Sequence, residues 1–191
     1  MKTIILTGSV RKGRQSHKAA HYIAGMLKGR NVETDLIDLT QTPLPILGTQ
    51  EAETSEAINN IARVGARITE ADALIFVTPE YHGSFSGVLK NALEHYWEEF
   101  QKKPVAVVAA SSGRMGGINA STQLQHVILS LGAFPMPYKL LISEIHNAFD
   151  ESGKPKNERI IKSTAKFLDE LLWFAGALYR AKREPEAMNT K

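Results

Sequence analysis

A loop near the N-terminus carries side chains that can bind an anion. The candidates are Ser9, Arg11, Arg14, Gln15 and Ser16. They follow an apolar, β-branched run, Thr3–Thr7, that is typical of a buried strand, and an Ala-rich segment expected to be helical runs on from Ser16 to Leu27. The first amides of a helix are unpaired and its dipole favours negative charge, so hydroxyl and guanidinium donors at this point can hold a phosphate. For this loop alone, a capped turn with two solvated arginines is the alternative.

A second loop combines a close backbone approach with aromatic surface. It contains Pro79, Glu80, Tyr81, His82 and Gly83, directly after the apolar run Ala73–Thr78. Pro79 is expected to end that strand because it lacks an amide donor, and Gly83 allows a ligand to approach the backbone. The loop suits a flat heteroaromatic ring that carries carbonyl and imino groups. A plain turn, with Tyr81 packed for stability, fits the composition equally well.

A third loop is rich in glycine and serine. It contains Ser111, Ser112, Gly113, Arg114 and Gly116, and it follows the apolar run Val105–Ala110. Such residues permit a ligand to lie close to the backbone. An ordinary connection into the next helix, with one left-handed residue, is the alternative.

Strand-like and helix-like segments alternate along the chain and would place these loops together. The expected strands are Thr3–Thr7, Val32–Leu39, Ala73–Thr78, Val105–Ala110 and Met136–Ile142. The expected helices are Ser16–Leu27, Thr54–Ile68, Gly87–Phe100, Ile118–Leu131 and Glu158–Arg180. This alternation predicts an α/β fold, namely a flavodoxin-like, doubly wound, five-stranded parallel sheet of order 2-1-3-4-5 with helices on both faces. In that order a ligand crevice forms where the loops after strands one and three diverge.

The composition is that of one ordinary domain. The chain has 191 residues, of which 43% are hydrophobic and 23% charged, and we expect one domain over residues 1–181 followed by a flexible tail over residues 182–191. It has no cysteine, which excludes thiol nucleophiles, disulfides and thiolate metal sites. The net charge of +3 comes without a long basic stripe or a long apolar run. We therefore expect a cytoplasmic protein with no nucleic-acid or membrane partner.

The six histidines offer one spacing that could bind a metal. His17 and His21 lie four residues apart on the first expected helix, so both rings would share one face. No acidic third ligand stands nearby in the sequence, and no metal site is expected.

Taken in order, the loop motifs resemble those of the NAD(P)H-dependent FMN reductase family. This flavodoxin-like group includes quinone, chromate and azo-dye reductases. The motifs are Gly8-Ser9-x-Arg11 with Ser16, Thr78-Pro79-Glu80-Tyr81-x-Gly83-Ser84, Gly87-x-Leu89-Lys90-Asn91-Ala92, and Ser112-Gly113-x-x-Gly116-Gly117. The resemblance covers roughly residues 2–142, and its second and third motifs are the most specific.

The resemblance implies a role for each loop. Ser9, Arg11 and Ser16, with the amides near Arg14 and Gln15, would hold the phosphate of FMN. Pro79, Glu80, Tyr81, His82 and Gly83 would line the ribityl chain and the isoalloxazine ring. Ser111, Ser112, Gly113 and Gly116 would approach the ring from the other side, with Arg114 near its carbonyl edge. NADPH or NADH would be the co-substrate, a flavin, quinone or azo compound the acceptor, and no side chain would act as a catalytic acid, base or nucleophile.

Two residues depart from the family pattern. His82 stands where the family usually has Asn, and Ser86 stands where Pro usually precedes the glycine. We expect the first to alter a contact with flavin or substrate and the second to loosen the start of the next helix. The resemblance also implies a homodimer or homotetramer. Aromatic residues such as Trp97 and Trp173 lie on the third and last expected helices, where apolar residues occupy more than one face, so some of them would suit such contacts.

Two other function classes fit parts of the sequence. A flavodoxin-like electron carrier would bind FMN but take its electrons from a protein partner, although flavodoxins usually dock through acidic surfaces. A dinucleotide dehydrogenase without flavin would use Asp38 as its ribose-binding acid, but the G-x-G-x-x-G fingerprint is missing after the first strand.

Overall fold

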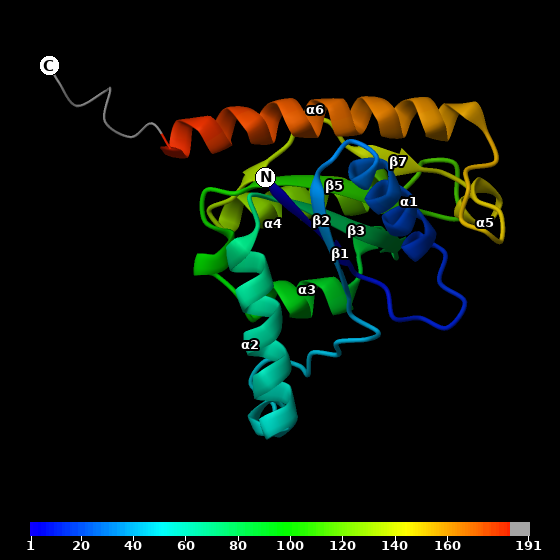
Figure 1. The fold of residues 1–191 in the computed structure, drawn as a ribbon. Coiled ribbons are helices and arrows are strands. Elements are labelled where there is room, and N and C mark those ends of the chain that lie inside the picture. The colour runs from blue at the N-terminus through cyan, green and yellow to red at the C-terminus, as the bar shows by residue number, and fades with distance from the viewer. Residues whose placement is uncertain (184–191) are drawn as a thin grey trace, which may run out of the picture.

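The computed structural model describes residues 1–183 and shows a largely parallel sheet between two layers of helices (Figure 1). The strands are β1 (Lys2–Thr7), β2 (Glu33–Asp38), β3 (Ala73–Tyr81), β4 (Ser84–Phe85), β5 (Pro104–Ala110), β6 (Phe134–Pro135) and β7 (Leu140–Ile142). The sheet order is β2-β1-β3-β5, and β6 and β7 both pair with the outer edge of β5. The predicted flavodoxin-like order is therefore confirmed.

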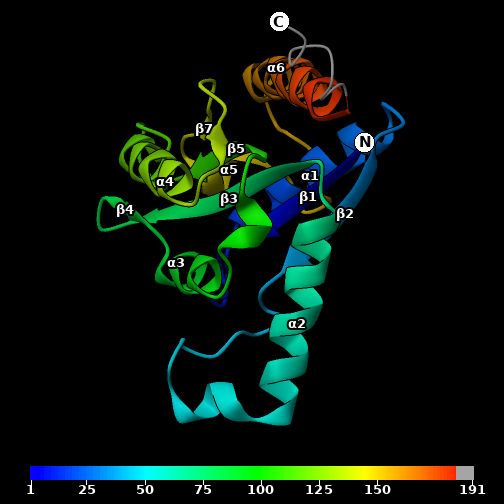
Figure 2. The same ribbon diagram turned by 90° about the vertical axis from the view of Figure 1, so that its left-hand side faces the viewer.

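Helices cover both faces of this sheet. They are α1 (Ser16–Lys28), α2 (Ser55–Glu70), α3 (Gly87–Glu94), α4 (Ile118–Ser130), α5 (Ile145–Ala148) and α6 (Glu158–Arg183), with two 3₁₀ turns, η1 (Gln50–Glu53) and η2 (Glu98–Phe100). Side chains of α1 and α6 share one apolar cluster, and side chains of α2, α3 and α4 share the other. Figure 2 shows α6 on one side of the sheet, α3 on the other, and α2 extending away from the body.

The central strands are buried on both faces, as their apolar runs predicted. In β1, Ile5 points into the cluster of α1 and α6, whereas Ile4 points into the cluster of α2, α3 and α4. Ile75 and Leu74 of β3 divide in the same way. This alternation with a period of two is what a strand between two helical layers requires.

The predicted fifth strand is wrong as a single element. Instead of one strand over Met136–Ile142, β6 and β7 are separated by a stretch without strand structure. Pro135 and Pro137 lie at the break and have no amide hydrogen to donate to a neighbouring strand. The amide of Met136, between them, still donates to the Val105 carbonyl at 2.8 Å.

The helix predicted over Gly87–Phe100 is also shorter than expected. It ends at Glu94, and a short 3₁₀ turn follows. The break accompanies burial of two rings: the Tyr96 hydroxyl donates to the Ile61 carbonyl at 3.0 Å, and Phe100 packs edge-on against Phe76.

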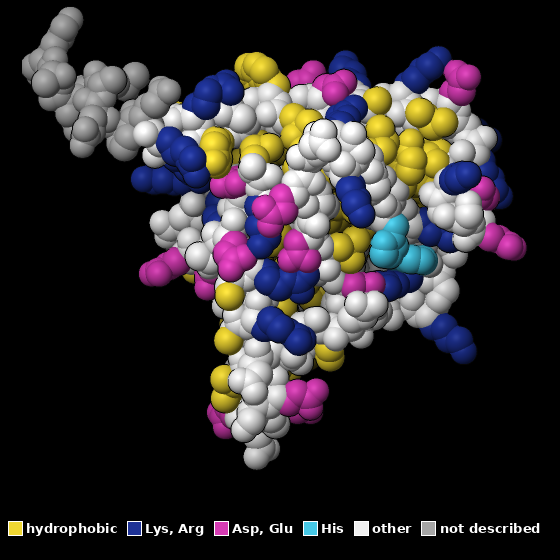
Figure 3. Space-filling model, in the orientation of Figure 1, with side chains coloured by type: hydrophobic (Ala, Val, Ile, Leu, Met, Phe, Trp, Pro, Cys, Tyr) yellow, Lys and Arg dark blue, Asp and Glu magenta, His cyan; other side chains and the backbone are white. Residues whose placement is uncertain are grey.

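The last helix runs further than predicted, to Arg183. The tail expected over residues 182–191 thus begins inside α6, and residues 184–191 lie outside the described part of the chain. No helix within residues 1–183 is both long enough and apolar enough to cross a membrane. Figure 3 shows positive and negative side chains intermixed over one face of the protein.

The predicted second loop is a β-hairpin. β3 continues past Pro79 to Tyr81, and β4 returns antiparallel to it, so that Tyr81 pairs with Ser84. The two residues of the turn, His82 and Gly83, both have positive φ, at 50° and 75°. Such turns match the twist of a two-stranded hairpin, and Asn and His are among the residues that tolerate positive φ best. The family's Asn and this chain's His82 therefore both suit the backbone.

Gly8 connects the end of β1 to β3 and to the start of α3. Its amide donates to the Val77 carbonyl at 2.8 Å, and its carbonyl accepts a hydrogen bond from the Ser86 hydroxyl. A Cβ on Gly8 would lie 2.6 Å from the Leu89 Cβ, so no larger residue fits. Ser86 is buried, and its hydroxyl also accepts from the Leu89 amide as the N-cap of α3. The expectation that Ser86 loosens this helix start is wrong.

We predict that Gly8→Ala destabilises the protein by about 2 kcal/mol, because the added methyl group overlaps Leu89. Gly25→Ala is the matched control, since Gly25 lies inside α1 with nothing within 4 Å of its would-be Cβ. That control should raise stability by up to about 1 kcal/mol. Urea unfolding measures both changes, and equal effects of the two variants would contradict the close approach at Gly8.

The hairpin turn generates a second prediction. His82→Asn should leave the free energy of unfolding within about 0.5 kcal/mol of the parent, because both side chains adopt positive φ and position 82 is exposed. His82→Val should lower it by about 1 kcal/mol, because a β-branched residue is strained there. Thermal unfolding of the two variants tests this, and a fully stable Val variant would show that the turn is not left-handed.

Candidate functional site

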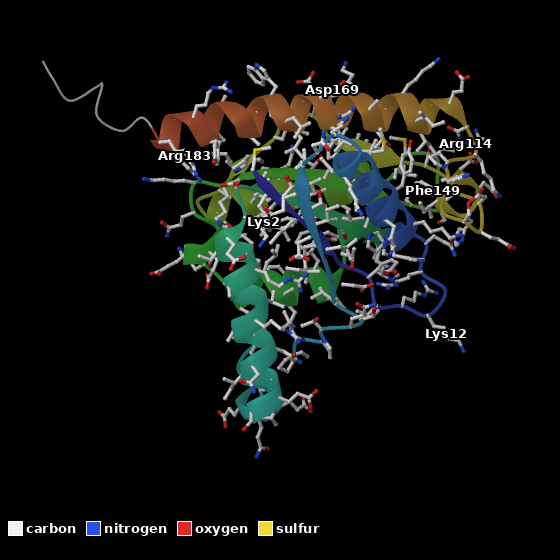
Figure 4. The ribbon with its side chains drawn as sticks, viewed as in Figure 1. Lys2, Lys12, Arg114, Phe149, Asp169 and Arg183 are labelled. Carbon is white, nitrogen blue, oxygen red and sulfur yellow. The ribbon has the colours of Figure 1, made fainter. Side chains whose placement is uncertain are left out.

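The three predicted loops converge on one cavity of about 290 Å³ at the carboxyl ends of β1, β3 and β5. Its lining contains ten of the predicted site residues: Ser9, Arg11, Arg14, Gln15, Ser16, Pro79, Glu80, Tyr81, Ser111 and Ser112. In Figure 4, Lys12 and Arg114 mark this end of the sheet, and Lys2 and Arg183 mark the opposite end. The prediction that the loops meet is therefore consistent with the geometry.

Five predicted site residues lie outside that lining: His82, Gly83, Gly113, Arg114 and Gly116. His82 and Gly83 form the hairpin turn, and Arg114 is exposed on the third loop. Gly116 is buried against β7, where an added Cβ would lie 3.0 Å from the Leu141 Cβ. Its role in the structure is close packing of the loop onto the sheet edge.

A side-chain contact joins the first and second loops across the cavity. The Ser9 hydroxyl and the Tyr81 hydroxyl lie 3.3 Å apart, within hydrogen-bonding distance. Ser9 is only 2% exposed, whereas Tyr81 is half-buried. The cavity lining thus includes a buried hydroxyl group in contact with a partly accessible aromatic residue.

Helix α1 begins at this cavity without a side-chain cap. Its N-cap residue, Gln15, makes no hydrogen bond to the helix, and its amide group turns back to the Gly13 carbonyl at 3.1 Å. By contrast, α2 and α3 are capped by Thr54 and Ser86. Uncapped first-turn amides next to the Ser16 hydroxyl provide donors for an anion.

Arg14 is held by an acidic partner on β2. Its guanidinium donates to both carboxylate oxygens of Asp38, at 2.7 and 2.5 Å, and to the Ser9 carbonyl at 2.6 Å. Burial raises the pKa of Asp38, but hydrogen bonds from Arg14 and Thr40 lower it by more, so this pKa lies well below its usual range. Arg14 thus shapes the loop, and Asp38 has both oxygens engaged rather than free for a ribose.

Glu80 is likewise engaged. Its carboxylate accepts a hydrogen bond from the Ala120 amide at 3.0 Å, in the first turn of α4. A carboxylate at a helix N-terminus satisfies a free amide and favours the dipole. Glu80 therefore fixes α4 to the end of β3 while lining the cavity.

The third loop is held from behind by the segment after β7. The Ser111 amide donates to the Ile142 carbonyl at 3.1 Å, and the Ile145 amide donates back to the Ser111 carbonyl at 3.0 Å. The Glu144 amide donates to the Gly113 carbonyl at 3.2 Å. These backbone bonds place α5 beside the cavity.

The sequence analysis missed five lining residues: Lys12, Gly13, Ala110, Ile145 and His146. The first three adjoin residues already named. Ile145 and His146 follow β7, and a usable signal existed, because every loop after a parallel strand emerges at the same edge of the sheet. The other singled-out histidines, His17 and His21, stack edge-to-face, and residues 1–183 contain no cluster of three or more His, Asp or Glu arranged to hold a metal.

Comparison with known proteins agrees with this geometry. The family model for NADPH-dependent FMN reductase matches residues 1–147. The NADPH azoreductase of Bacillus sp. strain OY1-2 is 28% identical over 172 residues, which cover 88% of this chain and 93% of that protein. The FMN-dependent NADPH-azoreductase of Staphylococcus haemolyticus strain JCSC1435 is 34% identical over 146 residues, covering 73% and 76%.

Solved structures of other flavin proteins share this fold. The flavoenzyme NAD(P)H:(acceptor) oxidoreductase FerB from Paracoccus denitrificans superimposes with a TM-score of 0.79 at 25% identity, covering 92% of this chain and 97% of its own. An archaeal flavodoxin shares the fold with a TM-score of 0.60 at 15% identity, covering 94% and 99%. The chain belongs to the NADPH-dependent FMN reductase family and is an FMN-dependent NAD(P)H oxidoreductase.

Proposed function

We propose that FMN binds in the cavity lined by Ser9, Tyr81 and Ser111, with its phosphate at the start of α1. The observation that carries this proposal is the convergence of three separate loops on one cavity beside an uncapped helix. The cavity lies at the carboxyl ends of adjacent parallel strands, where ligands of doubly wound sheets bind.

The residues present fit a phosphorylated aromatic ligand. The Ser9 and Ser16 hydroxyls, the first amides of α1 and the charges of Arg11 and Lys12 suit a phosphate dianion. Pro79, Ala110 and Tyr81 offer apolar and aromatic surface next to these donors. Among residues 1–183, the cavity lining contains one carboxylate, that of Glu80, and it accepts a hydrogen bond from the Ala120 amide, so a negative group meets little repulsion.

Arg14 and Glu80 act as positioning residues in this proposal. Arg14 fixes the backbone of Ser9 against β2, and Glu80 fixes α4 against β3. Neither side chain has to contact the flavin to matter. His82, Gly83, Gly113 and Arg114 remain proposed residues of the ring end, which we place at the rim beyond the cavity lining. Gly116 would support this loop from behind, where it packs against β7.

Bound FMN supplies hydride acceptance from reduced nicotinamide and electron transfer to an acceptor. The chain's own residues bind and orient the flavin and leave one of its faces reachable. The half-buried Tyr81 and the exposed Ser112 border the opening through which small molecules would enter. Small-molecule acceptors are the substrates, and the azoreductase names of the relatives favour azo compounds among them.

We also propose a homodimer or homotetramer in the cytoplasm. Trp97 and Trp173 are 61% and 70% exposed, and Trp173 borders a shallow apolar groove with Tyr138 and Phe174. Exposed apolar surface of this kind commonly marks contacts between subunits. The cytoplasmic assignment rests on the need for a steady supply of reduced nicotinamide.

Flavin binding tests the proposal directly. Flavin-depleted protein titrated with FMN should quench flavin fluorescence with saturation, and anaerobic NADPH should then bleach the flavin absorbance without any added protein partner. Bound flavin that NADPH does not bleach would favour the electron-carrier alternative. Absence of any FMN uptake would contradict the proposed site.

A substitution at the helix start tests the phosphate position. Ser16→Ala should weaken FMN binding about tenfold, because a hydrogen bond to a charged group is lost, while riboflavin, which has no phosphate, should bind as before. Ser130→Ala is the control, since Ser130 lies on α4 and donates only to its own helix. Unchanged FMN affinity in Ser16→Ala would show that the phosphate lies elsewhere.

The Arg14–Asp38 pair generates a pH prediction. The pKa of Asp38 is lower in the folded protein than the value of about 3.9 expected on unfolding, so its contribution to stability is present above about pH 4 and lost as pH falls below it. Asp38→Asn should lower the free energy of unfolding by about 3 kcal/mol at pH 7, because the partly buried Arg14 is left without its charged partner. At pH 3 the difference in free energy of unfolding between Asp38→Asn and the parent protein should be smaller. An equal gap at both pH values in urea titrations would contradict this.

A further inference from the structure

Helix α5 forms a fourth wall of the cavity that none of the predicted loops supplies. Ile145 and His146 both line the cavity, together with residues of the β1–α1 loop such as Arg11 and Ser16. Ile145 is buried in the apolar cluster on the α1 and α6 face of the sheet, and it lines the same cavity as Ser16 at the start of α1. The adjacent His146 is exposed, so its ring is accessible to a ligand.

The cations of the β1–α1 loop are poorly placed to fix the position of a bound anion. Arg14 has its guanidinium engaged by Asp38 and the Ser9 carbonyl. Lys12 is exposed, and Figure 4 shows its side chain extending away from the body of the protein. Arg11 is exposed as well. Long solvated side chains attract an anion but fix its position weakly, because they lose rotamer freedom on binding.

The backbone before His146 is held in an uncommon conformation. Glu144 has φ 49° and ψ 47°, the left-handed region that non-glycine residues seldom adopt. Its amide donates to Gly113 and its carbonyl accepts from Asn147, so the third loop and α5 fix this turn from both sides. Strain of this kind persists where surrounding structure enforces it, often at ligand sites. His146 follows Glu144 by two residues and lines the cavity.

We propose that His146 donates a hydrogen bond to the phosphate bound at the start of α1, and that this phosphate is the one carried by FMN. This inference rests on the proposed function. The imidazole is short and has few rotamers, so it can fix the anion from α5, whereas Arg11 and Lys12 contribute charge alone. His146 is then a binding residue for the phosphate group and takes no part in contacts with the ring.

The test is a comparison of two flavins in two variants. Flavin-depleted parent protein, His146→Gln and His126→Gln are each titrated with FMN and with riboflavin by fluorescence. His126 is the matched control, because it is exposed on α4 and lies outside this cavity. His146→Gln should weaken FMN binding about tenfold and change riboflavin binding by less than about twofold, while His126→Gln should change neither.

Three outcomes would overturn the proposal. Unchanged affinity for both flavins would show that His146 does not contact the ligand, and an equal loss for both would show a structural effect on the cavity. Loss of a preference for NADPH over NADH, measured as the ratio of KM values, with both flavin affinities unchanged, would assign His146 to the co-substrate's phosphate instead. Ser16→Ala distinguishes failure of the proposed FMN site from failure of the His146 proposal. If Ser16→Ala weakens FMN binding and His146→Gln does not, the flavin site stands and only the proposed role of His146 is wrong.

Discussion

The close approach at Gly8 is the constraint on which the rest of the site depends. Its amide and carbonyl bond to β3 and to Ser86, and its missing Cβ lets Leu89 of α3 pack against the backbone. This contact sets the direction in which the chain leaves β1. Because Ser9 comes next, the same contact brings its hydroxyl to 3.3 Å from Tyr81. A small displacement of this loop would separate Ser9 from Tyr81, even if every strand stayed in place.

Sequence alone predicted the parts of the structure that depend on local pattern. Continuous apolar runs mark β1, β3 and β5 because these strands are buried on both faces. Their alternation with helices leaves few topologies, and the topology brings the loops after them to one edge. This is why fifteen candidate site residues could be named on three distant segments from the sequence alone, and why ten of them line one cavity.

The remainder depends on partners that are remote in sequence. No residue near Arg14 in the sequence indicates that its guanidinium will bind Asp38 at the end of β2. Arg14 was therefore expected to face a phosphate. Ser86 was expected to loosen the start of α3 because it stands where the family usually has proline. In the structure, its hydroxyl stabilises that region by donating a hydrogen bond to the Gly8 carbonyl, which is remote in sequence. The position of α5 could not be predicted either, because no local pattern in the sequence marks it. The hydrogen bond from the Ile145 amide to the Ser111 carbonyl brings this helix to the cavity.

The chemistry of a flavin site makes few demands on individual side chains. When the cofactor carries out the redox step, the chain has only to bind and orient it. Backbone amides at a helix start, small residues at close approaches and hydroxyl groups do this, and many sequences can supply them. What cannot vary freely is the set of packing contacts that aim the loops, such as Gly8 on Leu89 and Gly116 on Leu141. Backbone geometry therefore carries most of the proposed site, and individual side chains, such as His146 in our proposal, would adjust how firmly the ligand is held.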